Sequence, residues 1–129
     1  MSNTDEFWMS KCLNLAKLGT GSVSPNPLVG AVIVKNGRQI SEGYHQRYGG
    51  PHAEIDAINK ALLKKKTLSG ATLYVNLEPC FHFGKTPPCV DAILKQRFSR
   101  VVVATQDPNP LVAGKSLKKL KKNGIKCTG

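Results

Sequence analysis

The sequence predicts one α/β domain of three layers, α/β/α, with a mixed five-stranded sheet at the centre. Its 129 residues match the size of a single domain. After an initial hairpin, strand patterns alternate with helical patterns, which is typical of a sheet covered by helices. Hydrophobic residues make up 40% of the chain, as in ordinary globular proteins. Residues 1–129 are therefore expected to form one domain.

The N-terminal part predicts a capped helix followed by a hairpin. Thr4 precedes two acidic residues and begins a helical pattern that ends at Gly19, as a helix with an N-terminal cap would. Strands at 28–35 and 38–44 flank Asn36-Gly37, a dipeptide that strongly favours a hairpin turn. The apolar stripe expected on the helix is Phe7, Trp8, Cys12, Leu15, Ala16 and Leu18.

Pro51 is expected to open the next helix, because its missing N–H would be unpaired there anyway. Its predicted buried stripe is Ile55, Ile58, Leu62 and Leu63.

The rest of the chain alternates strands and helices. The apolar run Val101 to Thr105 is rich in β-branched residues, so it predicts a strand buried on both faces. The other elements are strands at 71–77 and 125–127 and helices at 89–96 and 116–122, with a Pro-rich segment at 78–88.

The charge balance points toward an anionic partner. Nineteen Lys and Arg against eight Asp and Glu give a net charge of +11, which suits nucleic acid, a membrane surface or a phosphorylated substrate. The same lysines also suit solvated helix faces. Aromatic residues are only 6% of the chain and are not interleaved with the lysine runs, which weakens a stacking platform for single strands.

Export and membrane insertion are not indicated. The longest apolar run, 28–34, is far too short to span a bilayer, and acidic residues stand where an export signal would carry basic ones. We expect a cytoplasmic protein with no membrane or nucleic-acid partner.

Four cysteines occur, at positions 12, 80, 89 and 127. Without an export signal, metal binding or catalysis is a better default for them than disulfides. Cys12 lies on the apolar face of the first helix and Cys127 lies near the end of the chain. We interpret these two as spare thiols.

Two short motifs carry the chemistry: His52-Ala53-Glu54 at a helix start, and Pro79-Cys80 with Cys89 at the start of a later helix. One imidazole and two thiolates are donors that Zn²⁺ prefers. Helix N-termini lower the pKa of a thiol and prepare it as a ligand. Three protein ligands leave a fourth position for water, whose pKa zinc lowers to about 7. Glu54 could then move the proton of that water.

Two simpler interpretations stay open for these residues. Glu54 could be an acid that interacts only with the helix dipole. His82 could complete a closed site with His52, Cys80 and Cys89, which would make the zinc structural. The protein would then be a zinc-stabilised binding module without catalysis.

The pattern H-x-E followed by P-C-x-x-C marks zinc nucleobase deaminases. This chain departs from it, because eight residues rather than two separate Cys80 from Cys89. With this spacing, segment 78–89 resembles the deaminase domain of the riboflavin-biosynthesis pyrimidine deaminase/reductase family. The resemblance continues over essentially the whole chain, at residues 24–34, 43–45, 51–54 and 107–114.

The resemblance implies a cytidine-deaminase-like fold that holds one Zn²⁺ per chain. The implied reaction hydrolyses 2,5-diamino-6-ribosylamino-4(3H)-pyrimidinone 5′-phosphate to 5-amino-6-(5-phosphoribosylamino)uracil and ammonia. The implied zinc ligands are His52, Cys80 and Cys89, and Glu54 is the implied proton donor and acceptor. The implied substrate contacts are Asn26, His45, Lys85, Thr86, Asp107 and Asn109.

Three positions depart from the family. Phe81 and Phe83 stand where relatives carry smaller or polar residues, which would reshape the rim of the pocket. Ser116 replaces a frequent glycine, with little expected consequence. Taken without the resemblance, Asn26 and Asn109 are turn formers beside prolines, and His45 is a histidine in a loop.

A tRNA adenosine deaminase, or another nucleobase deaminase of this fold, is the alternative enzyme, and the charge of +11 would suit it. The cysteine spacing and the segment 107–110 argue against it. In the family a reductase domain commonly follows. NADPH would belong to that domain, which would here be a separate protein or a missing part of a longer chain. A homo-oligomer is compatible with all of these interpretations.

Overall fold

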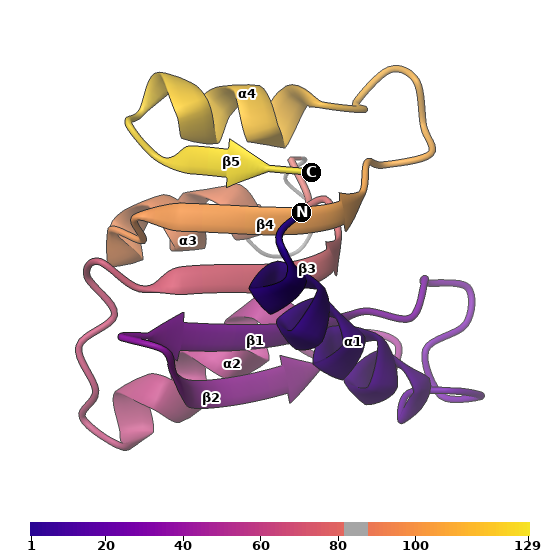
Figure 1. Ribbon diagram of the computed structural model, residues 1–129. Coiled ribbons are helices and arrows are strands. Elements are labelled where there is room, and N and C mark those ends of the chain that lie inside the picture. Colours follow the sequence, from indigo (N-terminus) through magenta and orange to yellow (C-terminus); the bar gives the residue numbers. More distant parts are fainter. Residues whose placement is uncertain (82–87) are drawn as a thin grey trace.

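The computed structural model describes residues 1–81 and 88–129, and it confirms the three predicted layers (Figure 1). In the described chain, five strands form one mixed sheet in the order β2-β1-β3-β4-β5. They are β1 (Gly30–Lys35), β2 (Arg38–Tyr44), β3 (Thr72–Leu77), β4 (Arg100–Thr105) and β5 (Lys126–Thr128). Helix α1 (Asn3–Lys17) covers one face. Helices α2 (Ala53–Leu63), α3 (Cys89–Gln96) and α4 (Lys115–Lys122) cover the other.

The strand directions bring distant parts of the chain to one edge of the sheet. Strand β1 is antiparallel to both β2 and β3, whereas β3, β4 and β5 are parallel. The start of β1 therefore lies at the same edge as the ends of β2, β3 and β4. Ligand sites in α/β sheets lie beyond the carboxyl ends of parallel strands, so a ligand site is expected at this edge.

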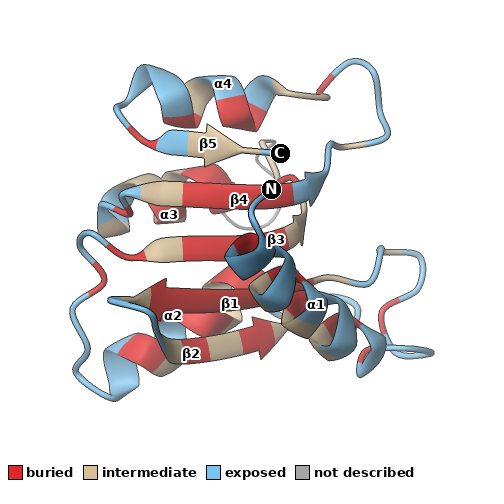
Figure 2. Ribbon diagram, in the orientation of Figure 1, coloured by how far each residue is buried: buried red, intermediate tan, exposed pale blue. Residues whose placement is uncertain are grey.

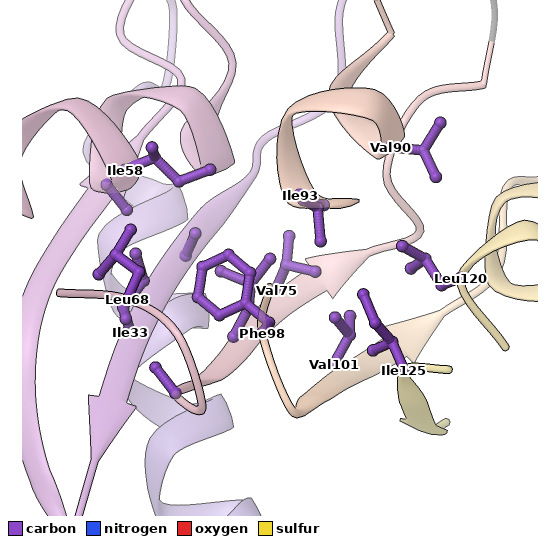
Figure 3. Close-up of a cluster of buried hydrophobic side chains, with 14 of the residues drawn as sticks. Ile33, Ile58, Leu68, Val75, Val90, Ile93, Phe98, Val101, Leu120 and Ile125 are labelled. Atoms are coloured by element: carbon purple, nitrogen blue, oxygen red, sulfur yellow. The ribbon is translucent and has the colours of Figure 1, made fainter. Parts of the chain in front are cut away.

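The apolar core has two parts, one on each face of the sheet. Val101 and Val103 pack into the larger cluster, beneath α2, α3 and α4 (Figure 3). Val102, between them, faces α1 with Met9 and Cys12. The central strands are buried, while the outer faces of the helices are exposed (Figure 2). This arrangement confirms the predicted burial on both faces for Val101 to Val103, whereas Ala104 and Thr105 at the end of β4 are exposed.

The hairpin between β1 and β2 is also confirmed. Asn36 and Gly37 both have positive φ, 53° and 75°. The favoured two-residue hairpin turn requires this left-handed conformation at both central positions.

The structure corrects the start and the buried face of α1. The N-cap is Ser2 rather than Thr4, because the Asp5 N–H donates to Ser2 Oγ over 3.1 Å in a capping box. Met9 is buried, whereas Phe7 and Leu18, expected in the stripe, are 59% and 63% exposed. The helix turns the row Asp5, Met9, Cys12 and Ala16 toward the sheet.

The buried face of α2 also differs from the prediction. Leu62 and Leu63 are 46% and 83% exposed. The helix instead packs through Ala53 and Ala57 against Gly43 of β2, where a Cβ atom would lie 2.5 Å from the Ala57 backbone nitrogen. This close approach of helix and strand leaves no room for leucines between them.

The helix α2 also begins later than predicted. Its N-cap is His52, so Pro51 precedes the helix rather than opening it.

A buried carboxylate ties α1 to three strands. Asp5 is 2% exposed, and the Arg100 guanidinium donates to both of its oxygens. Tyr74 Oη donates to Asp5 Oδ1 over 2.7 Å, and Arg100 also donates to Thr128 on β5. The hydrogen bonds from Arg100 and then Tyr74 hold the pKa of Asp5 well below its usual range, against the opposing effect of burial.

No helix among the described residues combines the length and the apolar character that crossing a membrane requires.

We predict that Asp5→Asn lowers the free energy of unfolding at pH 7 by about 2–4 kcal/mol, because it leaves Arg100 without its buried partner. The folded-state pKa of Asp5 is depressed, so its contribution is complete above the unfolded pKa of about 4 and declines as the pH falls below it. Urea unfolding at pH 7, 5 and 3.5 should show the gap between wild type and variant narrowing at the lowest pH.

Asp91→Asn is the matched control, since Asp91 pairs with Lys119 at a surface where both side chains are more than a third exposed. Such pairs contribute about 0–1 kcal/mol. Equal losses in the two variants would contradict the role given to Asp5.

Candidate active site

Three metal-ligating side chains meet at the edge where β2, β3 and β4 end. His52 is the N-cap of α2, Cys80 follows β3, and Cys89 is the first residue of α3. Their ligand atoms all lie within 4.8 Å of one another. His52 Nδ1 is 3.1 Å from Cys89 Sγ, and the Cys89 backbone N–H donates to Cys80 Sγ over 3.0 Å. The structure thus brings together the three residues that the sequence predicts as zinc ligands.

The surroundings shift the pKa values of the Cys80 and Cys89 thiols in opposite directions. The Cys89 thiol hydrogen-bonds to Cys80, and this contact, with help from His52 and the Cys89 N–H, lowers the pKa of Cys80 to about 4 against the effect of burial. The same hydrogen bond, together with burial, raises the pKa of Cys89. The pKa of His52 is raised by its contact with Cys80. These surroundings favour the deprotonated form of Cys80, which is the form in which a thiol binds a metal ion.

The donor set fits zinc. Zinc binds thiolate at about 2.3 Å and imidazole at about 2.0–2.1 Å, so its ligand atoms stand roughly 3.3–3.8 Å apart around a tetrahedral ion. The separations here, 3.1 Å between His52 Nδ1 and Cys89 Sγ and up to 4.8 Å for the set, bracket that spacing. Two sulfur donors and one nitrogen donor also match the preference of zinc over harder cations.

Glu54 lies beside this cluster on the first turn of α2 and is 3% exposed. Burial raises the pKa of its carboxyl group to about 7, and the nearby Cys80 charge adds to the rise. A carboxyl group in this range can accept and return a proton at neutral pH.

A pocket of about 190 Å³ opens beside the donors. One water molecule needs about 10–15 Å³ of such space, so the pocket has room for a small ligand together with a water. Its described lining residues come from the segment before β1, the ends of β2 and β3, the start of α2 and the segment after β4: Asn26, Pro27, Val29, His45, His52, Glu54, Leu77, Glu78, Cys80 and Asp107.

Asn26 and His45, both expected from the resemblance, are joined in this pocket. His45 is 3% exposed, and its Nδ1 lies 2.9 Å from the Pro51 carbonyl oxygen, to which only a protonated nitrogen could donate. Its Nε2 is then free to accept from Asn26 Nδ2 at 3.1 Å. This chain of contacts turns the Asn26 amide so that its oxygen is available to a ligand.

Asp107 and Asn109 are placed differently from each other. Asp107 lines the pocket, and its Oδ1 accepts the Asn109 N–H over 2.9 Å. Asn109 does not lie among the described lining residues. Its Oδ1 accepts the Leu111 N–H over 3.0 Å, so its side chain stabilises the turn after β4.

Other expected positions lie away from the pocket or outside the described residues. Phe81 packs against the larger core cluster, with Lys119 Nζ 5.9 Å from its ring centre. Cys12 is fully buried, and burial raises the pKa of its thiol to about 12. The predictions for His82, Phe83, Lys85 and Thr86 lie outside the described residues.

The sequence patterns predict no role for two polar residues at this edge, Asn76 and Glu78. The Asn76 side chain accepts the Gly30 N–H over 2.8 Å and donates to the Leu28 carbonyl over 3.0 Å, which holds the segment before β1. Glu78 is 5% exposed and lines the pocket. Its place directly before Pro79-Cys80, at a strand end, is the signal that could have drawn attention to it.

Comparison with known proteins agrees with this geometry. Residues 2–105 match the family model described as the cytidine and deoxycytidylate deaminase zinc-binding region. The chain belongs to this family. The match includes His52, Glu54, Cys80 and Cys89 within its bounds.

Two relatives are similar to this chain over 94% of its length. The chain is 50% identical over 121 residues to the diaminohydroxyphosphoribosylamino-pyrimidine deaminase of Buchnera aphidicola, covering 94% of this chain and 80% of that protein. It is 54% identical to the riboflavin biosynthesis protein RibD of Aquifex aeolicus over 94% of this chain, but it spans only 33% of that protein.

A solved structure shows the same fold. The Thermotoga maritima diaminohydroxyphosphoribosylaminopyrimidine deaminase/5-amino-6-(5-phosphoribosylamino)uracil reductase superposes with a TM-score of 0.92 at 51% identity. The superposition covers 97% of this chain and 36% of that one. The family fold expected from the sequence is thereby confirmed.

We predict that the purified protein binds one Zn²⁺ per chain and that Cys80→Ser lowers its affinity for the metal. The loss should exceed the roughly 10- to 100-fold that removal of an outer-shell partner costs, because a thiolate donor itself is removed. Competition with a chromogenic chelator measures the affinity. Cys127→Ser is the control, since this half-buried thiol lies outside the donor cluster. Equal affinity in both variants would contradict the assignment.

Proposed function

We propose that this protein is the deaminase that converts 2,5-diamino-6-ribosylamino-4(3H)-pyrimidinone 5′-phosphate to 5-amino-6-(5-phosphoribosylamino)uracil in riboflavin biosynthesis. The observation that carries the proposal is the pocket in which a buried carboxyl group, Glu54, adjoins the donors His52, Cys80 and Cys89. Similarity over nearly the whole chain to a Buchnera deaminase of this name supports the substrate.

The reaction exchanges an amino group for an oxygen. Water attacks the ring carbon that bears the amino group, the carbon–nitrogen bond breaks, and ammonia leaves, so no other reactant is consumed. His52, Cys80 and Cys89 would hold zinc, which when bound supplies the Lewis acid that makes water nucleophilic at neutral pH. Glu54 takes the proton of the attacking water, passes it to the adjacent ring nitrogen, and then helps to protonate the leaving amine.

The pocket walls would orient the ring for this attack. Asn26, turned by its contact with His45, offers an acceptor to the amino and N–H groups of a diaminopyrimidinone. Asp107 offers a second acceptor from the segment after β4. Lys85 and Thr86 stay predicted contacts of the substrate. The predicted cation among them, Lys85, suits the phosphate group.

A reductase is the proposed partner in the pathway. The chain spans about a third of the RibD proteins that it resembles, and the Thermotoga relative is named as both a deaminase and a reductase. A reductase would act on the product of this site. NADPH would be bound there rather than by residues 1–129.

Substrate choice can be tested directly by ammonia release. We predict turnover of the diaminopyrimidine nucleotide and turnover at least about 100-fold lower for cytidine, deoxycytidylate and adenosine in tRNA, because all three lack the 5-amino group of the pyrimidinone, and cytidine also lacks the phosphate. A preference for tRNA would instead support the alternative enzyme. An absence of activity on every substrate, with zinc bound, would favour a non-catalytic binding module.

We predict that Glu54→Gln retains one zinc per chain and lowers kcat by about 10²–10⁴-fold, the usual contribution of a general acid–base. The amide keeps the size of the carboxyl group but does not shuttle a proton. Glu42→Gln, on β2 outside the pocket, is the matched control and should keep wild-type kcat. Wild-type turnover by the Glu54 variant would exclude the proposed mechanism.

A further inference from the structure

We propose that Glu78 is a positioning residue for this reaction, and that Ser116 works with it. The Glu78 carboxylate fixes both ends of the segment from Asp107 to Gly114, and so places Asp107 at the pocket. The proposal rests on the proposed function for its effect on substrate, while the clamp itself is a property of the fold.

The contacts that define this Glu78 clamp come from one carboxylate. Oε1 accepts the N–H of Asp107 over 3.1 Å and the N–H of Gly114 over 2.8 Å. Oε2 accepts the Ser116 N–H over 3.1 Å and the Ser116 hydroxyl over 2.7 Å, with the Leu117 N–H at 3.4 Å. Glu78 lies 29 residues from the first of these partners and 39 from the last.

The clamp also supplies what the N-terminus of α4 lacks. The N-cap of this helix is Gly114, which has no side chain to accept a hydrogen bond, and its first turn contains no acidic residue. The first N–H groups of a helix need acceptors, and a negative charge there is stabilising. Glu78 provides both from the end of β3. The start of α4 is therefore fixed to the strand that leads into Cys80.

The segment that the clamp holds forms part of the pocket wall. It leaves β4, contributes Asp107 to the lining, and returns to α4 at Gly114. Because the N–H groups of Asp107 and Gly114 donate to the same oxygen of Glu78, the two ends of the segment stay together. A shift of Glu78 would move Asp107 relative to the donor cluster.

Glu78 borders the pocket but is poorly suited to move protons there. Five donors surround its two oxygens, whereas a carboxylate offers about four lone-pair sites. Glu54, in contrast, has no such set of donors among the described contacts. The two buried glutamates therefore divide into one that reacts and one that positions.

Substitution of Ser116 tests the proposal with a small change, the loss of one hydroxyl group that donates to Glu78. The Ser116 hydroxyl is the one side-chain donor among the described contacts of the clamp, whose other donors are backbone N–H groups. Removal of this hydroxyl leaves the four backbone donors of Glu78 in place. It should loosen the clamp without unfolding α4.

The experiment compares Ser116→Ala with Ser41→Ala in the zinc-loaded protein. Ser41 is also buried and donates one hydrogen bond of 2.7 Å, to the Ala57 carbonyl on α2. We expect Ser116→Ala to raise KM about 3- to 10-fold, as the loss of one hydrogen bond would, with kcat within about twofold and zinc content unchanged. Ser41→Ala should leave KM unaltered. Equal KM values in the two variants would overturn the proposal.

Amide hydrogen exchange tests the clamp without activity. In Ser116→Ala, and more strongly in Glu78→Gln, the amides of Asp107, Gly114 and Leu117 should exchange faster, while those of Val101 to Val103 keep their protection. Uniformly faster exchange, or no change at the clamp, would contradict the proposal. If the wild type binds zinc but does not deaminate the nucleotide, the proposed function fails, and the exchange data still decide whether the clamp exists.

Discussion

The hydrogen bond from the Cys89 backbone N–H to Cys80 Sγ is the contact on which the donor cluster depends. It joins the end of β3 to the first turn of α3, so two thiols nine positions apart become neighbours. The N-terminus of α3 also favours negative charge, and the pKa of Cys80 falls to about 4, chiefly through its hydrogen bond with the Cys89 side chain. The imidazole joins them from the cap of α2, because α2 and α3 cover the same face of the sheet.

The environment assigns different tasks to the two buried glutamates at this edge. Burial dominates for Glu54 and raises its pKa to about 7. Burial acts on Glu78 as well, but the hydrogen bonds from Gly114, Ser116, Asp107 and Leu117 together lower its pKa. Pairs of carboxyl groups whose surroundings push their pKa values apart are typical of acid–base sites. In the proposed mechanism Glu54 would shuttle protons, whereas Glu78 would hold the segment that contributes Asp107 to the pocket wall.

In the part of the chain that the structure describes, the basic residues behind the net charge of +11 do not gather at the pocket. Among the described residues that line the pocket, none is Lys or Arg. A basic groove lies instead at the opposite end of the β1–β2 hairpin, where Lys35, Arg38, Lys64 and Lys66 come together. Position, rather than net charge, therefore determines which basic residues can meet a phosphorylated substrate, and Lys85 is the one that the motifs select.

The sequence alone determined the donor types, the order of strands and helices, and the hairpin at Asn36-Gly37, because each depends on local pattern or on the chemistry of a side chain. It misjudged the faces of two helices, since the burial of Met9 and the exposure of Leu63 follow from close packing at the sheet. Only the tertiary structure decided the tasks of Asn76 and Glu78. Their partners lie 29–48 residues away in the chain, and no local pattern encodes a hydrogen bond that forms only when distant strands and helices are brought to one edge.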